Sequence, residues 1–185
     1  MKKILSKRSE IKILEGVEVL IENYTIKLKG PKGESERNFL NPRIKIEKKE
    51  NSILVTPSNK KITKEDKMFV NSTISHIKNM ISGVLNGYEA KLKICSGHFP
   101  ISVSIDNKMM TIKNFLGEKI PRKASISDDV SVKLNGDIVT ITGCNKEEVG
   151  QAAATIERAC RINNRDRRLF QDGIWITQSS EEIKK

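Results

Sequence analysis

The most informative pattern of apolar and polar residues in this chain occurs twice. Residues 17–30 align without a gap on residues 130–143, and a glycine closes each copy. Apolar side chains coincide at Val17/Val130, Val19/Val132, Ile21/Leu134, Ile26/Val139 and Leu28/Ile141. In the first arm of each copy, apolar and polar residues alternate, as is typical of a strand with one buried face. Because two copies are too few for a solenoid, the pattern predicts a duplicated domain.

Turn residues indicate where these strands reverse direction. Asn135-Gly136 predicts a two-residue hairpin turn of type I′, because such a turn needs a positive φ angle at both positions. Gly30-Pro31-Lys32-Gly33 predicts another turn. Further hairpins are expected across residues 48–52 and across Asp106-Asn107-Lys108. Both halves of the chain are therefore rich in predicted antiparallel strands.

Each half also carries one predicted amphipathic helix. Thr63 with Asp66 three residues on resembles a capping box, and Asn86-Gly87 is a helix-ending pair. The apolar stripe between them consists of Val70, Ile74, Ile77, Ile81 and Val84. The second helix is predicted to begin at Asn145, with Glu148 as the capping partner. Its apolar face consists of Val149, Ala152, Ala153, Ile156 and Cys160.

These elements predict an α+β fold of two similar domains that arose by internal duplication. Each domain is expected to be an antiparallel sheet packed against one helix. The end of the first helix sets the boundary, which gives a first domain over residues 1–86 and a second over residues 87–185. A last strand from Gly173 to Thr177 is expected before a short polar C-terminal tail.

The charge of the chain narrows the classes of partner. Its 185 residues include 34 Lys+Arg against 23 Asp+Glu, for a net charge of +11. Such a charge favours polyanions, with nucleic acid as the first candidate and an anionic membrane surface as the second. Neither helix has the large apolar anchors of a membrane-surface helix, so no membrane partner is expected. Aromatic residues make up only 4% of the chain, which favours folded RNA read through its backbone over stacked single strands.

Candidates for catalysis or metal binding are few. The three cysteines, Cys95, Cys144 and Cys160, are far apart in sequence, so they fit neither a disulfide framework nor a zinc site. We expect them to be small apolar core residues in a reducing compartment. His76 is expected on a helix surface. His98 is a loop residue that can contact a phosphate but is expected to have no partner that would make it a base. We therefore expect no catalytic residues, no metal, no cofactor and no small-molecule substrate.

Basic residues gather in the second half of the chain. On a helical wheel, Arg158, Arg161 and Arg165 lie opposite the apolar face of the second helix. Arginine suits phosphate because its planar fork bonds two oxygens at once. A second basic group surrounds the glycine-containing loop 114–117, whose backbone N–H groups are expected near an anion. The predicted RNA-binding residues are Lys113, Lys119, Arg122, Lys123, Arg158, Arg161, Arg165, Arg167, Arg168 and His98.

Segments spread over nearly the whole chain are similar to one known family. The most specific are His98-Phe99-Pro100-Ile101 and Asn114-Phe115-Leu116-Gly117-Glu118-Lys119. Others are Gly30-Pro31-Lys32-Gly33, Met80-Ile81-Ser82-Gly83-Val84, and Asn164-Arg165-Asp166 leading to Phe170-Gln171-Asp172-Gly173-Ile174. The sequence resembles the universal large-subunit ribosomal protein six family in its eukaryotic and archaeal form, which is called large-subunit ribosomal protein nine in eukaryotes.

The resemblance implies a non-enzymatic structural constituent of the large ribosomal subunit, located in the cytoplasm. It implies that the second domain binds ribosomal RNA near the sarcin–ricin loop and the stalk base, beside neighbouring ribosomal proteins, and supports the translation-factor site. From the residues alone, two alternatives stay open. One is an RNA-processing enzyme, and the other is a free regulatory RNA-binding module that uses the same basic surface.

Overall fold

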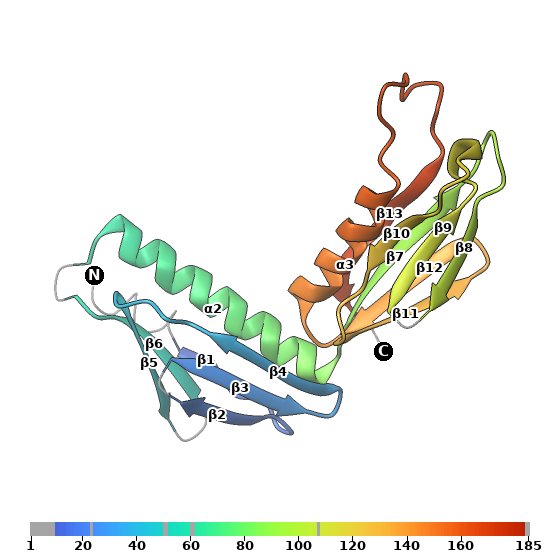
Figure 1. Ribbon diagram of the computed structural model, residues 1–185. Coiled ribbons are helices and arrows are strands. Elements are labelled where there is room, and N and C mark those ends of the chain that lie inside the picture. Colours follow the sequence, from blue (N-terminus) through green and yellow to red (C-terminus); the bar gives the residue numbers. More distant parts are fainter. Residues whose placement is uncertain (1–9, 23, 50–51, 60–61, 107, 184–185) are drawn as a thin grey trace. The chain divides into compact units, whose positions relative to one another are not determined.

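The computed structural model describes residues 10–22, 24–49, 52–59, 62–106 and 108–183. The chain divides between Asn86 and Gly87 into two compact units, called unit 1 and unit 2 here. Each unit combines antiparallel strands with one long helix (Figure 1). The predicted α+β class is therefore confirmed. Residues 50–51 and Asn107, which fall in two of the predicted hairpin turns, lie outside the described residues.

The described part of unit 1 has two three-stranded antiparallel sheets and helix α2. The strand orders are β2-β3-β4 and β1-β6-β5. The elements are β1 (Glu10–Lys12), β2 (Glu18–Glu22), β3 (Thr25–Gly30), β4 (Gly33–Asn38), β5 (Ile44–Lys49), β6 (Ser52–Pro57) and α2 (Lys64–Leu85). Helix α2 contacts strands of both sheets, namely β3, β4, β5 and β6. The core of unit 1 thus lies between the helix and the sheets.

Helix α2 begins and ends as the sequence predicts. The backbone N–H of Asp66 donates to Oγ1 of Thr63 at 3.2 Å, and the N–H of Thr63 donates to Oδ2 of Asp66 at 2.9 Å. This reciprocal pair is a complete capping box. Asn86 is the C-cap, and Gly87 follows with a φ of +79°. All five residues of the predicted apolar stripe are buried.

The glycine that closes each repeat lies against the helix of its own unit. A Cβ atom at Gly30 would lie 2.7 Å from the backbone oxygen of Val84 in α2, a separation that no side chain tolerates. The same oxygen accepts a hydrogen bond from the N–H of Lys32 at 3.0 Å, so the β3–β4 turn satisfies a helix-end carbonyl. At Gly143, a Cβ atom would lie 2.9 Å from a methyl group of Val149. Close helix packing thus explains both glycines.

The described part of unit 2 has a four-stranded sheet, a three-stranded sheet and helix α3. The strand orders are β11-β12-β7-β13 and β10-β9-β8, and the paired strands are antiparallel. The elements are β7 (Tyr88–Cys95), β8 (Ser102–Asp106), β9 (Met109–Lys113), the 3-10 helix η1 (Phe115–Gly117), β10 (Arg122–Ser125), β11 (Val130–Asn135), β12 (Ile138–Gly143), α3 (Lys146–Ala159) and β13 (Gly173–Glu182). Helix α3 packs against strands of both sheets, and its predicted apolar face is buried.

The turn between β11 and β12 differs in type from the prediction. Asn135 pairs with Ile138, so the two-residue loop is Gly136-Asp137 and not Asn135-Gly136. Of these two residues only Gly136 has a positive φ angle, at +59°. A glycine with positive φ at the first central position fits a type II′ turn, whereas type I′ needs positive φ at both.

Two element ends also differ from the prediction. Helix α3 ends at Ala159 with Cys160 as its C-cap, so Arg161 and Arg165 follow the helix and do not lie on its outer face. Strand β13 continues to Glu182, with register shifts after Ile176 and Gln178. The residues predicted as a polar tail therefore extend the strand along β7, because register shifts let pairing continue past an irregular stretch.

Candidate nucleic-acid interface

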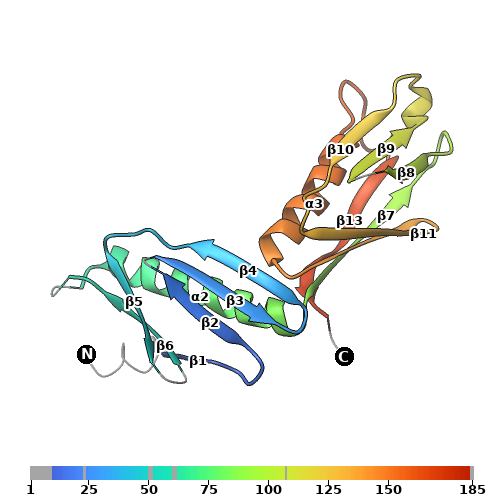
Figure 2. The same cartoon turned by 60° about the horizontal axis from the view of Figure 1, so that its bottom comes forward.

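Three loops of unit 2 meet at one end of its sheets (Figures 1 and 2). They are residues 96–101 between β7 and β8, residues 114–121 between β9 and β10, and residues 160–172 between α3 and β13. Nδ2 of Asn114 donates to the carbonyl of Pro100 at 3.0 Å, which joins the first two loops. Contacts of His98 and Arg122, described below, join the third. We call this surface the loop end.

His98 has a carboxylate partner that the sequence did not reveal. Its Nδ1 lies 2.5 Å from Oδ2 of Asp172, whose side chain is only 1% exposed. Oδ1 of Asp172 accepts the backbone N–H groups of Gly97 at 2.5 Å and His98 at 3.0 Å. The expectation of a partnerless histidine was therefore wrong. Asp172 follows Phe170-Gln171 directly in the sequence, but nothing in that pattern indicates a contact with a residue 74 positions earlier.

Opposing effects act on the pKa of Asp172. Burial alone would raise it, because a charged carboxylate loses hydration. Hydrogen bonds from the backbone and ring of His98 and from the Gly97 backbone outweigh the burial, so the pKa of Asp172 lies below its ordinary value. The carboxylate is thus ionised at neutral pH. It fixes both the loop that begins at Ser96 and the imidazole orientation.

Phe170 forms an aromatic platform beneath two of the predicted RNA-binding residues. Its ring stacks on the His98 ring, with centroids 4.7 Å apart and an interplanar angle of 24°. The Arg165 guanidinium carbon lies 4.8 Å from the Phe170 ring centre. Both partners remain accessible, since Arg165 is exposed and the His98 side chain is 41% exposed. The platform therefore presents a cation and an imidazole at the surface.

Arg122 differs from the other predicted RNA-binding residues, because protein groups engage its guanidinium. Nε and Nη2 donate to the carboxylate of Glu118 at 2.8 and 2.6 Å. Nη1 donates to the carbonyls of Ala159 and Arg161 at 3.0 and 2.9 Å. The guanidinium also lies 4.2 Å from the centre of the buried Phe115 ring. Arg122 thus holds the end of α3 against loop 114–121, a structural role that the sequence did not predict.

Two backbone hydrogen bonds stabilise the glycine-containing loop 114–117. The N–H of Gly117 bonds to the carbonyl of Asn114 at 3.4 Å, and the N–H of Glu118 bonds to the carbonyl of Phe115 at 2.9 Å. These two amides are thus used inside the loop. Positive φ angles at Asn114, Leu116 and Gly117 close the loop tightly, so its contribution to the surface comes from side chains.

The other predicted residues are exposed and lie at or beside the loop end. Lys113 ends β9, Lys119 lies in loop 114–121, and Lys123 lies at the start of β10. Arg158 is exposed on the last turn of α3. The exposed arginines of loop 160–172 are Arg161, Arg165, Arg167 and Arg168. The positions of these residues span 56 residues in sequence, and their charges thus lie at the loop end or beside it.

Three carboxylates at this surface bond to side chains of the protein, and a fourth, Glu157, accepts the backbone N–H of Ile176 at 3.3 Å. Glu118 bonds to Arg122, Asp172 to His98, and Asp166 to Arg168 at 2.9 Å. Arg168 is 89% exposed, so its ion pair is a surface pair of small energetic value. The unpaired positive charge of the loop end therefore comes mainly from the lysines and from Arg158, Arg161, Arg165 and Arg167.

The described residues contain no group of three or more His, Cys, Asp or Glu side chains placed to hold a metal ion. Nor do they contain a helix whose length and apolar content would let it cross a membrane. His76 lies on α2, where its Nδ1 is 3.1 Å from Nη1 of Arg37.

Comparisons with known proteins agree on one family. The sequence model described as Ribosomal protein L6 matches residues 13–87 and 99–173, once in each unit. The chain is 46% identical over 169 residues to the large ribosomal subunit protein uL6 of Methanobrevibacter smithii, covering 91% of this chain and 94% of that protein. It is 46% identical over 176 residues to uL6 of Staphylothermus marinus, covering 94% and 95%. It is 40% identical over 185 residues to uL6 of Desulfurococcus amylolyticus, covering 99% and 100%.

Proposed function

The chain belongs to the ribosomal protein L6 family in its archaeal form, and from that premise we propose that it binds large-subunit ribosomal RNA through the loop end of unit 2. As a member of this family it is a structural protein of the large ribosomal subunit and not an enzyme. Its partners are accordingly ribosomal RNA and other ribosomal proteins, in the cytoplasm. What we propose is the surface of the protein that meets the RNA and the region of the RNA that it meets.

The observation that carries the proposal is the charge arrangement at the loop end. Exposed lysines and arginines from β9, β10, α3 and two loops lie there together, while the nearby carboxylates are paired with protein groups. A surface of unpaired cations attracts phosphate and displaces condensed counterions from RNA. The few aromatic side chains favour backbone contacts with folded RNA. The proposed contact residues are Lys113, Lys119, Lys123, Arg158, Arg161, Arg165, Arg167, Arg168 and His98.

We place the bound RNA near the sarcin–ricin loop and the stalk base, where the protein would support the translation-factor site. The family resemblance of His98-Phe99-Pro100-Ile101 and of loop 114–119 supports this position, because both segments lie at the loop end. A stem from that region of ribosomal RNA is thus expected to bind better than an unrelated stem of equal length. Both stems carry the same backbone charge, so a difference between them reports location and not charge.

The test measures the affinity of the purified full chain for both stems over a range of salt concentrations. The logarithm of the association constant should fall linearly with the logarithm of salt concentration, by about 0.9 per phosphate neutralised. Replacing Arg161, Arg165 and Arg167 with glutamine should make this slope shallower. An affinity that does not depend on salt would overturn RNA binding through the loop end. Equal affinity for the two stems would overturn the proposed location.

A further inference from the structure

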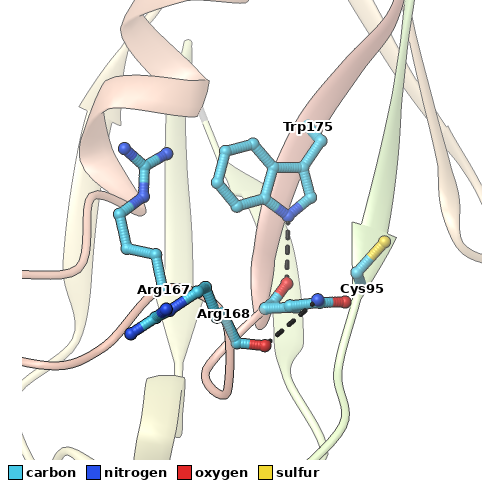
Figure 3. A pocket seen from close by; sticks show the side chains of 5 residues that line it. Cys95, Arg167, Arg168 and Trp175 are labelled. Atoms are coloured by element: carbon cyan, nitrogen blue, oxygen red, sulfur yellow. Dashed lines mark hydrogen bonds between the residues drawn. The ribbon is translucent and has the colours of Figure 1, made fainter.

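The one tryptophan of the chain, Trp175, lines a pocket beside the loop end. The pocket has a volume of about 520 Å³, within the range that holds small ligands. Figure 3 shows Trp175 between Arg167 on one side and Cys95, at the end of β7, on the other. Arg168 and Gln171 complete the lining. An aromatic ring with arginine and amide neighbours is a combination that RNA-binding proteins use for unpaired bases.

The Trp175 ring is held in place before any ligand arrives. Its Nε1 donates to the backbone carbonyl of Gln171 at 3.1 Å. Gly173 lets the ring lie close to the chain, since a Cβ atom there would be 3.1 Å from ring atoms. Gln171 is itself fixed, because its Nε2 donates to the Arg168 carbonyl at 3.3 Å. A fixed ring loses little freedom on binding, which favours stacking.

Arg167 lies between this pocket and the exposed arginines of the loop end. Its guanidinium carbon lies 5.7 Å from the centre of the Trp175 ring, at the outer limit of a cation–π contact. It also lines a second hollow of about 410 Å³, on the side of the ring that faces the last turn of α3, together with Arg158 and Arg161. A cation between the two hollows can pair with the phosphate of a nucleotide whose base occupies one of them.

We propose that the Trp175 pocket takes a single unpaired nucleobase from an otherwise folded RNA. The base stacks on the indole ring, the Gln171 amide faces the base edge, and Arg167 pairs with the phosphate of the same nucleotide. This inference rests on the proposed function and adds to it the feature of the RNA that is read. The low aromatic content argues against stacking along a single strand, but one ring is enough for one base.

The test uses three RNA hairpins that share one stem. The first has one bulged nucleotide, the second has an abasic residue at the bulge, and the third is fully paired. Trp175 fluorescence is the readout, because no other tryptophan contributes to it. The bulged hairpin should quench this fluorescence, whereas the abasic and paired hairpins should bind without quenching. Equal quenching by the abasic hairpin, or binding of all three without quenching, would overturn the inference.

Two variants of Trp175 distinguish the contribution of base stacking to the affinity from the contribution of charge. With labelled RNA, Trp175→Leu should weaken binding of the bulged hairpin by roughly 5- to 150-fold, the range for one base on one aromatic ring. Binding of the paired hairpin should change less than about twofold, and Trp175→Phe should keep most of the affinity because it keeps a ring. If Trp175→Leu does not fold, the quenching comparison with the unaltered chain decides alone.

The outcomes also separate this inference from the function on which it rests. If none of the three hairpins binds, the proposed function fails and this inference with it. If all three bind with equal affinity and Trp175 is unchanged, the loop end still binds RNA. In that case the pocket is covered by a neighbouring protein or serves only packing, and the nucleobase inference alone is rejected.

Discussion

Nδ1 of His98 lies 2.5 Å from Oδ2 of Asp172, although 74 residues separate the two in sequence. The contact joins the loop after β7 to the residue that precedes β13. Because Asp172 also accepts two backbone N–H groups from loop 96–101, it organises the loop as well as the ring. One buried carboxylate thereby sets the geometry of the platform that carries Arg165.

Replacing Asp172 with asparagine should destabilise unit 2 at neutral pH. The change removes a buried charge that is stabilised by hydrogen bonds, so the free energy of unfolding should fall by about 1.5–3 kcal/mol. The pKa of Asp172 is lowered in the folded protein, so its contribution is complete above the ordinary value of 3.8. It is lost as the pH falls through the lowered folded pKa. The parent and the variant should therefore become equally stable in strong acid.

Denaturation followed by Trp175 fluorescence checks this expectation, since the only tryptophan lies in unit 2. Asp128→Asn is the matched control, because Asp128 is exposed and its ion pair with Lys108 is at the surface. The control should change stability little at any pH. Equal stability of Asp172→Asn and the parent at pH 7 would contradict the structural role assigned to Asp172.

Arg122 should matter for stability more than its exposed neighbour Lys123. Arg122→Ala removes hydrogen bonds to Glu118 and to the carbonyls of Ala159 and Arg161, so unit 2 should lose about 2–3 kcal/mol of unfolding free energy. Arg122→Lys should lose less stability than Arg122→Ala but should not match the parent. An ammonium group cannot reproduce a guanidinium fork that bonds a carboxylate and two carbonyls at once. Lys123→Ala should cost little. Urea denaturation of the three variants checks the order, and equal losses at residues 122 and 123 would reject it.

Cys160 should resist alkylation in the folded protein. Burial raises the pKa of its thiol to about 11, against the ordinary 9.0, which lowers the thiolate fraction about a hundredfold. With iodoacetamide at pH 8, Cys95 should react while Cys160 stays unmodified, and all three cysteines should react after unfolding in urea. Peptide mass spectrometry reports each site. Reaction of native Cys160 as fast as Cys95 would show that its thiol is not buried in the core of unit 2.

Much of the fold follows from the sequence because its determinants are local. The capping box at Thr63 and the apolar stripes of α2 and α3 each act within a few residues or one helix face. The errors fall where neighbouring elements decide. Helix α3 stops at Ala159, whose carbonyl accepts a hydrogen bond from Arg122 of β10. Strand β13 extends to Glu182 because β7 offers a partner strand.

The kinds of residue at the candidate site could be predicted from the sequence, but the contacts among them could not. A count of arginines and lysines indicates a basic surface, and the resemblance of the loop segments indicates which half carries it. Roles that depend on a partner distant in sequence were not predictable. The contact of Asp172 with His98 and the hydrogen bond from Arg122 to the end of α3 join residues that are 74 and 37 positions apart.

The central claim is that the loop end of unit 2, and not unit 1, carries the RNA-facing charge. Two triple variants test it with equal loss of charge. One replaces Arg161, Arg165 and Arg167 with glutamine, and the other replaces the exposed α2 residues Lys64, Lys67 and Lys78. Glutamine keeps side-chain length close to that of the parent residues and, in α2, a similar helix propensity. Both variants should therefore fold, as checked by denaturation.

The deciding measurement is the share of each tagged variant in large-subunit fractions of a sucrose gradient, relative to the unaltered chain. The arginine variant should be depleted by about tenfold or more, because each lost phosphate contact removes a charge-assisted hydrogen bond. The lysine variant should sediment with the large subunit nearly as well as the parent. Equal incorporation of the two variants would contradict the account.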